Sequence, residues 1–371
     1  MTVRFRFKRG AALYGAYAAI AAAAFVAAYS VAPAVASVTA ATATAASAAF
    51  GGGRAGAFDA LNRSRPLLAL GSETQCERYG GLPARWRDDP RAGMVHLRGG
   101  EFVFGSKLGY EDERPAGDGR THVDGFWIDQ TDVTNAQFAA FVKATGYVSD
   151  SERQGGAVVF HTPTRDEMNA RDLAWWTWVK GAAWNHPDGP GSTLDGRMNQ
   201  PVTLVTQADA LAYARWLGRD LPTEAEWEFA GKAGREGADL DTAPRDEHGK
   251  PSANYWQGVF PVLNTNEDGH TGLAPVGCYA ANDFKLYDMI GNAWEWTRDV
   301  YTGPHQSHTN GDTAAVAPAG RKHDTPMVIK GGSFLCSRDY CVRYRAASRE
   351  QQEADLPASH IGFRTVARDA S

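Results

Sequence analysis

Apolar and polar residues partly alternate over three short stretches, and this pattern predicts β-strands. The stretches are Met94 to Leu97, Glu101 to Phe104 and Thr121 to Ile128. A period of two is typical of strands that bury one face against a core. The sequence has no internal repeat, so nothing in it indicates a repeat architecture.

Three further stretches have helical spacing, and each begins at a threonine that can cap a helix. Thr134 and Thr223 are each followed three residues later by Gln or Glu, which makes a capping box. Thr206 opens a helix that runs to about Leu217, and Gly146 is the expected stop of the first helix. The residues expected to face the core are Phe138, Phe141, Val142, Leu211, Tyr213, Ala214, Leu217, Trp227 and Phe229. We expect these helices to form scaffold rather than catalytic machinery.

Composition adds that much of the fold is loop. The 371 residues include 40 Gly, 18 Pro and 11 Trp, which predicts ordered loops with large aromatic side chains filling the core. The length allows one large domain or two small ones. The net charge of -5 on a mixed surface argues against a nucleic-acid-binding protein. Pattern and composition together predict an irregular α+β protein.

The N-terminus has the order of an export signal. Basic residues at Arg4, Arg6, Lys8 and Arg9 precede an apolar run from Ala11 to about Ala36, which ends in Ala-Val-Ala. We expect residues 1–36 to be either a cleaved signal or, because the run is long, a membrane anchor. Residues 37–90 are expected to be a flexible linker and extension, and 91–371 the main domain. The main domain would then lie outside the cytoplasm, in the periplasm or secreted.

Two of the four cysteines, Cys336 and Cys341, lie five positions apart, which favours a shared role. The neighbouring arginines are Arg338, Arg343, Arg345, Arg349 and Arg364. Positive surroundings lower a thiol pKa, and the thiolate is the form that binds metals. Two soft thiolates suit copper(I) better than zinc, which usually takes four ligands. Spacing alone also fits a structural disulfide, and Cys76 with Cys278 could form another one.

The motifs around this pair resemble those of formylglycine-generating enzymes, the sulfatase-modifying factors, from about Met94 to Ala367. They include Gly-Gly-Glu-Phe (99–102), Asp-Val-Thr-Asn (132–135), Trp-Trp-x-x-Val-Lys-Gly-Ala (175–182), Leu-Pro-Thr-Glu-Ala-Glu-Trp-Glu (221–228), Gly-Asn-Ala-Trp-Glu-Trp (291–296) and Gly-Phe-Arg (362–364). The discriminating string is Gly-Gly-Ser-x-x-Cys-x-x-x-Tyr-Cys-x-Arg-Tyr-Arg, which ends at Arg345.

The resemblance implies a fold and an activity. The fold would be a single compact, loop-rich α+β domain related to C-type lectins, with little regular secondary structure. The activity would be copper-dependent oxidation, with O2, of a cysteine in a Cys-x-Pro-x-Arg segment of a sulfatase to Cα-formylglycine. Cys336 and Cys341 would hold copper(I), and Ser333 would hydrogen-bond an oxygen species. Trp294 would line the site, and Tyr340 would support it. The substrate would be an extended or unfolded sulfatase chain.

The segment from Asn254 to Glu295 is rich in side chains with oxygen ligands, which suit calcium because it takes six to eight oxygens. The resemblance implies two structural calcium sites there. The first would use Asn254, the Tyr255 carbonyl, Asp268 and the His270 carbonyl. The second would use Asp288, the carbonyls of Gly291 and Ala293, and Glu295. Without the resemblance, solvated turn residues explain the same composition equally well.

Some positions depart from the family pattern and leave alternatives open. His360 stands where well-studied members have asparagine, and the stretch 350–358 also differs, so substrate preference is open. His360 is either an extra metal ligand or a hydrogen-bonded loop histidine. The acid that would bind the substrate arginine is not identified, with Asp150 and Glu152 among the candidates.

Two other functions compete with the oxidase. A non-catalytic, lectin-like binding module would join Cys336 to Cys341 as a disulfide. An iron-dependent sulfoxide synthase would add a helical domain with a His-x3-His-x-Glu motif, which this sequence lacks.

Overall fold

The computed structural model describes residues 60–62, 65, 67–235, 244–305 and 325–368. The expected export signal or anchor at 1–36, and the linker up to residue 59, lie outside these residues and stay predictions. Within the described part of the chain, every helix is too short or too polar to cross a membrane.

The central sheet has four strands in the order β11-β10-β9-β12. They are β9 (Trp294–Val300), β10 (Pro326–Lys330), β11 (Arg349–Glu353) and β12 (Ile361–Gly362). β12 runs parallel to β9, while β9, β10 and β11 pair antiparallel. The β12–β9 pairing brings the segment that follows β11 back to the middle of the domain.

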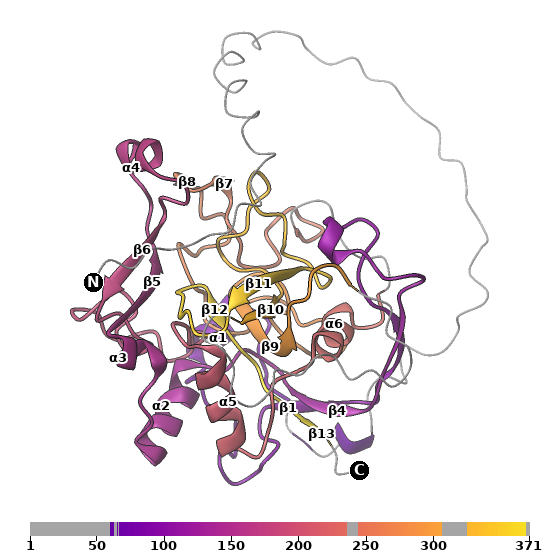
Figure 1. The fold of residues 1–371 in the computed structure, drawn as a ribbon. Helices are drawn as coiled ribbons and strands as arrows, with labels where there is room; N and C mark the ends of the chain where they lie inside the picture. The colour runs from indigo at the N-terminus through magenta and orange to yellow at the C-terminus, as the bar shows by residue number, and fades with distance from the viewer. Residues whose placement is uncertain (1–59, 63–64, 66, 236–243, 306–324, 369–371) are drawn as a thin grey trace, which may run out of the picture. The chain divides into compact units, whose positions relative to one another are not determined.

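Helices α5 (Gln207–Trp216) and α6 (Glu224–Lys232) cover this sheet from opposite sides, as Figure 1 shows. Successive side chains of a strand point to opposite faces. Trp296 of β9 accordingly lies in the core cluster that contains α5, whereas its neighbour Glu295 accepts a hydrogen bond from Trp227 of α6 at 2.7 Å. The sheet therefore has two buried faces.

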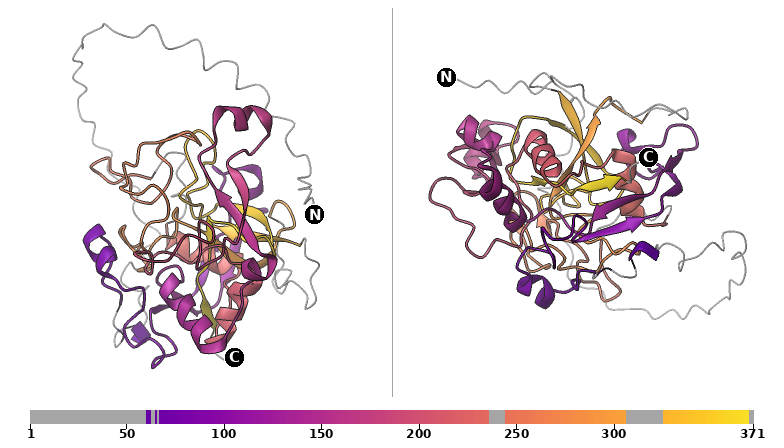
Figure 2. Two further views of the ribbon diagram at one scale, coloured as in Figure 1. Left: turned by 90° about the vertical axis from the view of Figure 1, so that its left-hand side faces the viewer. Right: turned by 90° about the horizontal axis from the view of Figure 1, so that it is seen from below.

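The other strands form a three-stranded sheet and three hairpins. The sheet is β1 (Met94–Leu97), β4 (Phe126–Asp129) and β13 (Val366–Arg368), in the order β1-β4-β13. The hairpins are β2 (Gly100–Val103) with β3 (Arg120–Val123), β5 (Gly156–Phe160) with β6 (Trp176–Lys180), and β7 (Gly258–Val259) with β8 (Leu263–Asn264). The connection from β5 to β6 carries α4 (Arg165–Ala170), which stands at the tip of the magenta hairpin in Figure 2.

The prediction of one strand over Thr121 to Ile128 is wrong, because the segment forms parts of two strands. β3 pairs with β2, and β4 pairs with β1 and β13 in a different sheet. The chain turns at Asp124 and Gly125, next to Gly99. A Cβ on Gly99 would lie 2.1 Å from the Val123 carbonyl oxygen, so the turn requires a glycine there.

The three helices predicted from their caps are confirmed. α2 spans Asn135–Thr145, and α2, α5 and α6 each begin with a reciprocal capping box at the expected threonine. α2 ends at Gly146, whose φ of 68° is the left-handed conformation that glycine favours. The remaining helical segments are η1 (Ala60–Asn62), α1 (Glu73–Arg78), η2 (Glu111–Glu113) and α3 (Asp150–Gln154). Short elements joined by ordered loops confirm the loop-rich α+β class.

A disulfide joins Cys76 in α1 to Cys278. Gly277, next to Cys278, donates its N–H to Asp288 at 2.6 Å, and Cys76 accepts a hydrogen bond from Asn199 at 2.8 Å. The bond thus fixes α1 to the middle of the domain, and packed structure begins before residue 91, where the sequence analysis placed the start of the main domain.

Replacing both Cys76 and Cys278 by serine is expected to lower the free energy of unfolding by about 2–5 kcal/mol. The bridge closes a loop of more than 200 residues, with a sequence separation of 202, and both sulfurs are buried. Denaturant unfolding of the non-reduced wild type and the double variant measures the difference. Equal midpoints would show that the bridge does not restrain the unfolded chain.

Candidate thiol site and cation sites

The loop between β10 and β11 carries both thiols, and two glycines turn the chain into it. Gly331 and Gly332 have φ of 96° and 81°, and a Cβ on Gly332 would lie 2.5 Å from the Arg343 carbonyl oxygen. Within the loop, Ser337 and Cys341 exchange backbone hydrogen bonds of 3.1 and 3.2 Å. These bonds close a small ring that brings the two cysteines face to face.

The sulfurs of Cys336 and Cys341 are 3.2 Å apart and not bonded to each other. A disulfide would bring them to about 2.05 Å. Cys336 is buried, whereas Cys341 is partly exposed. The structure therefore has a free thiol pair with one buried member and one reachable from the surface, and not the disulfide of the binding-module alternative.

The two thiols have opposite pKa shifts. Burial acts to raise the pKa of Cys336, but the hydrogen bond with Cys341, the Ser333 backbone and the Arg343 charge outweigh it, so this pKa is lowered. The same hydrogen bond, together with burial, holds the pKa of Cys341 well above its ordinary value. These opposite shifts favour Cys336 as the member of the pair that ionises first, with Cys341 as the donor of the hydrogen bond between the two sulfurs.

Titration of the reduced protein should show one thiolate already present below the ordinary cysteine pKa of about 8.5. Because a lowered pKa means that the ionised form is stabilised by folding, this thiolate persists as the pH falls until the lowered pKa is reached. Ultraviolet absorbance of the thiolate measures it. The signal should disappear in Cys336→Ser, and its persistence there would contradict the assignment.

Most of the arginines near the thiols in sequence are paired elsewhere in the structure. The charge of Arg343 acts to lower the pKa of both cysteines, although at Cys341 the hydrogen bond with Cys336 and burial outweigh it. Arg345 pairs with Glu113. Arg349 and Arg364 bind buried carboxylates of the α6 region and of β9 at 2.8 and 2.7 Å. The arginines that neighbour the thiols in sequence are therefore largely engaged in buried ion pairs.

Tyr110 is a neighbour of the thiol loop that sequence reasoning missed. Its hydroxyl accepts a hydrogen bond from the Val342 N–H at 3.2 Å. The Arg343 and Arg345 guanidinium groups lie 4.3 and 5.2 Å from its ring centre. Tyr110 comes more than 200 positions before the loop, so no local signal could have found it.

The remaining predicted site residues have different surroundings. Ser333 is fully buried, and its hydroxyl accepts a hydrogen bond from the Leu335 N–H at 3.3 Å. Trp294 is buried in the same core cluster as Cys336. Tyr340 is 47% exposed and stacks on Phe260 at 4.5 Å between ring centres. Tyr340 therefore forms part of the surface beside the thiols.

His360, Asp150 and Glu152 do not form a metal-binding or charged cluster with the two cysteines. Burial lowers the pKa of His360 to about 3, its Nδ1 has no partner, and its ring packs on Trp176 at 4.6 Å, so it is a neutral packing residue. Asp150 bonds Arg153 and the cap of α5, and Glu152 completes the cap of its own helix α3. Both acids are engaged in the scaffold.

At the first predicted calcium site, two of the expected oxygen ligands accept hydrogen bonds from the same side-chain amide. The Gln257 side-chain amide hydrogen-bonds both the Tyr255 carbonyl and, at 2.7 Å, the Asp268 carboxylate. Asp268 also accepts the His270 N–H at 3.0 Å. The Asn254 side-chain nitrogen donates to other groups, which leaves its oxygen for a ligand. The Tyr255 and Asp268 oxygens are donors that suit calcium, which would replace their hydrogen bonds with the Gln257 amide.

The second predicted calcium site is only partly free. Asp288 is buried, one of its carboxylate oxygens has no partner, and burial raises its pKa to about 6. Glu295 is already engaged by Arg364, with two contacts of 2.7 Å, and by Trp227. Asp132 is fully buried nearby, and neither of its oxygens accepts a hydrogen bond. The Asp288 and Asp132 oxygens that accept no hydrogen bond fit a cation, although Asp132 lies 4.0 Å from Arg364 and Glu295 is less available than expected.

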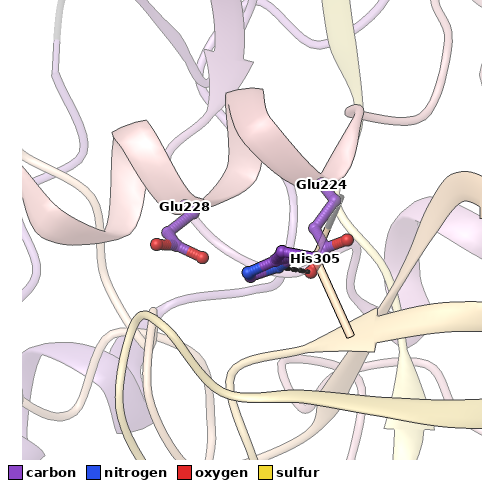
Figure 3. Close-up of side chains that lie close together, drawn as sticks. All are labelled: Glu224, Glu228 and His305. Atoms are coloured by element: carbon purple, nitrogen blue, oxygen red, sulfur yellow. Dashed lines mark hydrogen bonds and ion pairs between the residues drawn. The ribbon is translucent and has the colours of Figure 1, made fainter. Parts of the chain in front are cut away.

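Figure 3 shows Glu224 and Glu228 of α6 with His305, the group whose ligand atoms, within the described residues, lie close enough to share a metal ion. Three cations, one of them Lys232 at 2.9 Å from Glu228, already neutralise these acids. Lys330 lies 2.9 Å from Glu228, and Arg349 binds Glu224 at 2.8 Å. Further positive charge would be repelled, so this group is a buried ion network and not a metal site.

Comparison with known proteins assigns the chain to one protein class. Residues 81–369 match the family model for the sulfatase-modifying factor enzyme 1-like domain. The structure of PvdO from Pseudomonas aeruginosa has the same fold, with a TM-score of 0.51 and 24% identity over 74% of this chain and 93% of that one. The fold and site therefore define a domain of the sulfatase-modifying-factor class.

Two similar proteins show which family within this class the chain belongs to. The formylglycine-generating enzyme of Thermomonospora curvata is 43% identical over 77% of this chain and 97% of its own length. A mouse protein named inactive C-alpha-formylglycine-generating enzyme 2 is 35% identical over 73% of this chain and 84% of its own length. The chain belongs to the formylglycine-generating enzyme family and is an enzyme of that kind.

Proposed function

We propose that this protein oxidises a cysteine in a Cys-x-Pro-x-Arg segment of a sulfatase to Cα-formylglycine, using O2 and copper. The observation that carries the proposal is the free Cys336–Cys341 pair, 3.2 Å apart, in a chain of this family. The family also includes a relative named inactive, so the fold alone does not establish activity, and the free thiol pair is the feature of this chain that supports it.

The donor set of the pair fits copper(I). Two sulfur ligands are the chemistry that a soft monovalent ion prefers. Within the described residues, no third metal-ligating side chain joins the two sulfurs. A metal between them requires the sulfurs to move further apart than 3.2 Å. When bound, copper would supply the electron transfer with dioxygen that the thiols alone cannot provide.

The residues of the chain would position the reactants. Partly exposed Cys341 marks the side from which a substrate thiol approaches, and buried Cys336 supplies the thiolate. Trp294, buried in the same core cluster as Cys336, would close the site from the core and exclude water, and Ser333 would offer a buried hydroxyl. In the net reaction the Cβ–S bond of the substrate is replaced by an aldehyde. O2 and two electrons from an external thiol reductant are consumed, and hydrogen sulfide and water are released.

The test is direct conversion of a peptide. Purified protein is incubated with copper, a thiol reductant, air and a peptide that carries Cys-x-Pro-x-Arg, and mass spectrometry follows the product. We expect replacement of the thiol by an aldehyde, and no product without oxygen. If no peptide of a varied panel is converted, the oxidase assignment is wrong.

We also propose that calcium occupies the two oxygen-rich sites and stabilises the loops from Asn254 to Glu295. The gathered oxygens at Tyr255 and Asp268, and the unpartnered Asp288 oxygen, support this. Calorimetry should show a lower melting temperature after chelation and its recovery with added calcium. An unchanged melting temperature would leave these residues as ordinary turns.

Export of the protein is a further part of the proposal. It depends on the N-terminal pattern of basic and then apolar residues up to Ala36. The Cys76–Cys278 disulfide supports it, because such bonds persist mainly in oxidising compartments. Cleavage after Ala36 or retention as an anchor can be decided from the N-terminal sequence of the protein recovered from cells.

A further inference from the structure

The β7–β8 hairpin exposes an apolar surface next to the thiol loop. Val259 and Leu263 are directly paired across the two strands, so their side chains lie on one face of the hairpin. They are 53% and 55% exposed, and Val262 in the turn between them is 45% exposed. Three large apolar side chains within five positions, each about half exposed, form a patch and not isolated surface residues.

The hairpin is fastened to the thiol loop by specific contacts. Asp339, which lies between the two cysteines in sequence, accepts the Phe260 N–H at 3.2 Å and the Ser337 hydroxyl at 2.7 Å. Phe260 itself points inward and stacks on Tyr340 at 4.5 Å. A further backbone hydrogen bond of 2.9 Å joins Trp256, just before the hairpin, to Cys336. The apolar patch therefore has a fixed position relative to Cys341.

These contacts indicate which binding partner the apolar patch accommodates. Tyr340, next to Cys341 in sequence, stacks on Phe260 in the turn of the hairpin, so the hairpin borders the surface from which a substrate thiol would reach Cys341. An extended chain advances about 3.3 Å per residue, so residues only a few positions from the substrate cysteine reach the patch. The occupant that the site requires is thus the substrate chain itself.

We propose that Val259, Val262 and Leu263 are a docking surface for apolar side chains that flank the modified cysteine of the substrate chain. This inference rests on the proposed function and adds a substrate preference to it. Substrates with a large apolar residue outside the Cys-x-Pro-x-Arg segment should bind better than those with small polar residues there.

The test compares two peptides in wild type and in Leu263→Asp. One peptide contains only the Cys-x-Pro-x-Arg segment with glycine and serine flanks, and the other has leucine in the flanks. In wild type the leucine peptide should have the lower KM. In Leu263→Asp, the KM of the leucine peptide should rise by roughly ten-fold, because one apolar contact is worth about that factor. Its kcat, and the KM of the peptide with glycine and serine flanks, should stay unchanged. Val259→Asp should do the same.

The matched control is Leu82→Asp, which changes another exposed leucine (42%) outside the hairpin and the thiol loop. It should leave both KM values unchanged. Binding of the same peptides with serine in place of the reactive cysteine, measured by fluorescence, gives a readout that does not need turnover. Equal KM and binding in all variants would overturn the inference while the oxidase assignment stands. An equal loss for both peptides would also overturn it, because the hairpin would then only support the thiol loop.

Discussion

Cys336→Ser is expected to reduce kcat/KM for the Cys-x-Pro-x-Arg peptide by at least about 10³-fold, as removal of an essential group typically does. The variant replaces the buried thiolate of the pair by a hydroxyl, which is a poor ligand for a soft ion. It also removes the sulfur that shares a hydrogen bond with Cys341. Product formation by mass spectrometry, with copper and reductant at fixed concentrations, measures the loss.

A matched control separates this effect from a general loss of cysteine. The Cys76→Ser and Cys278→Ser double variant changes the other two cysteines, which the structure joins in a disulfide. It should keep its turnover at temperatures where it stays folded. Substantial activity in folded Cys336→Ser would mean that the pair is not the reaction centre.

Arg364→Met is expected to give the largest loss of stability, about 3–5 kcal/mol, because it leaves buried charge without a partner. Arg364 is fully buried and binds both oxygens of Glu295 at 2.7 Å. It also donates to the Tyr287 carbonyl at 3.0 Å and lies 4.0 Å from Asp132. Without the guanidinium, the carboxylates of Glu295, Asp132 and Asp288 face one another in the core.

Denaturant unfolding measures this change, and the exposed Arg235–Asp283 pair supplies its control. Arg235→Met should cost less than about 1 kcal/mol, since solvent screens that pair. Added calcium should recover part of the loss in Arg364→Met, because a cation compensates the same carboxylates. A loss no larger than that of Arg235→Met would show that the buried pair contributes little net stability.

Local signals predicted the scaffold well. Thr134, Thr206 and Thr223 cap their helices in the structure because a capping box depends only on residues three positions apart. The strand prediction over 121–128 was wrong for the opposite reason. Alternation continues through the segment, but the turn at Gly125 sends its halves into different sheets, and that depends on distant partners.

The site was predictable only as far as its residues lie together in the sequence. Cys336 and Cys341 share one loop, so their spacing and flanking motif identified them. Tyr110 and the β7–β8 hairpin contact that loop from positions far away in the sequence. No local sequence pattern predicts such contacts. Arg364, which the sequence analysis grouped with the thiols, is instead buried with Glu295, because a charge can be neutralised by a partner far away in sequence.

The most direct test of the account is titration of the reduced protein with copper(I) against a competing chelator. The account predicts tight binding of one ion per chain, lost in Cys336→Ser and retained in the Cys76→Ser and Cys278→Ser double variant. The account would be contradicted if Cys336 and Cys341 were found joined in a disulfide that resists reduction and does not bind copper.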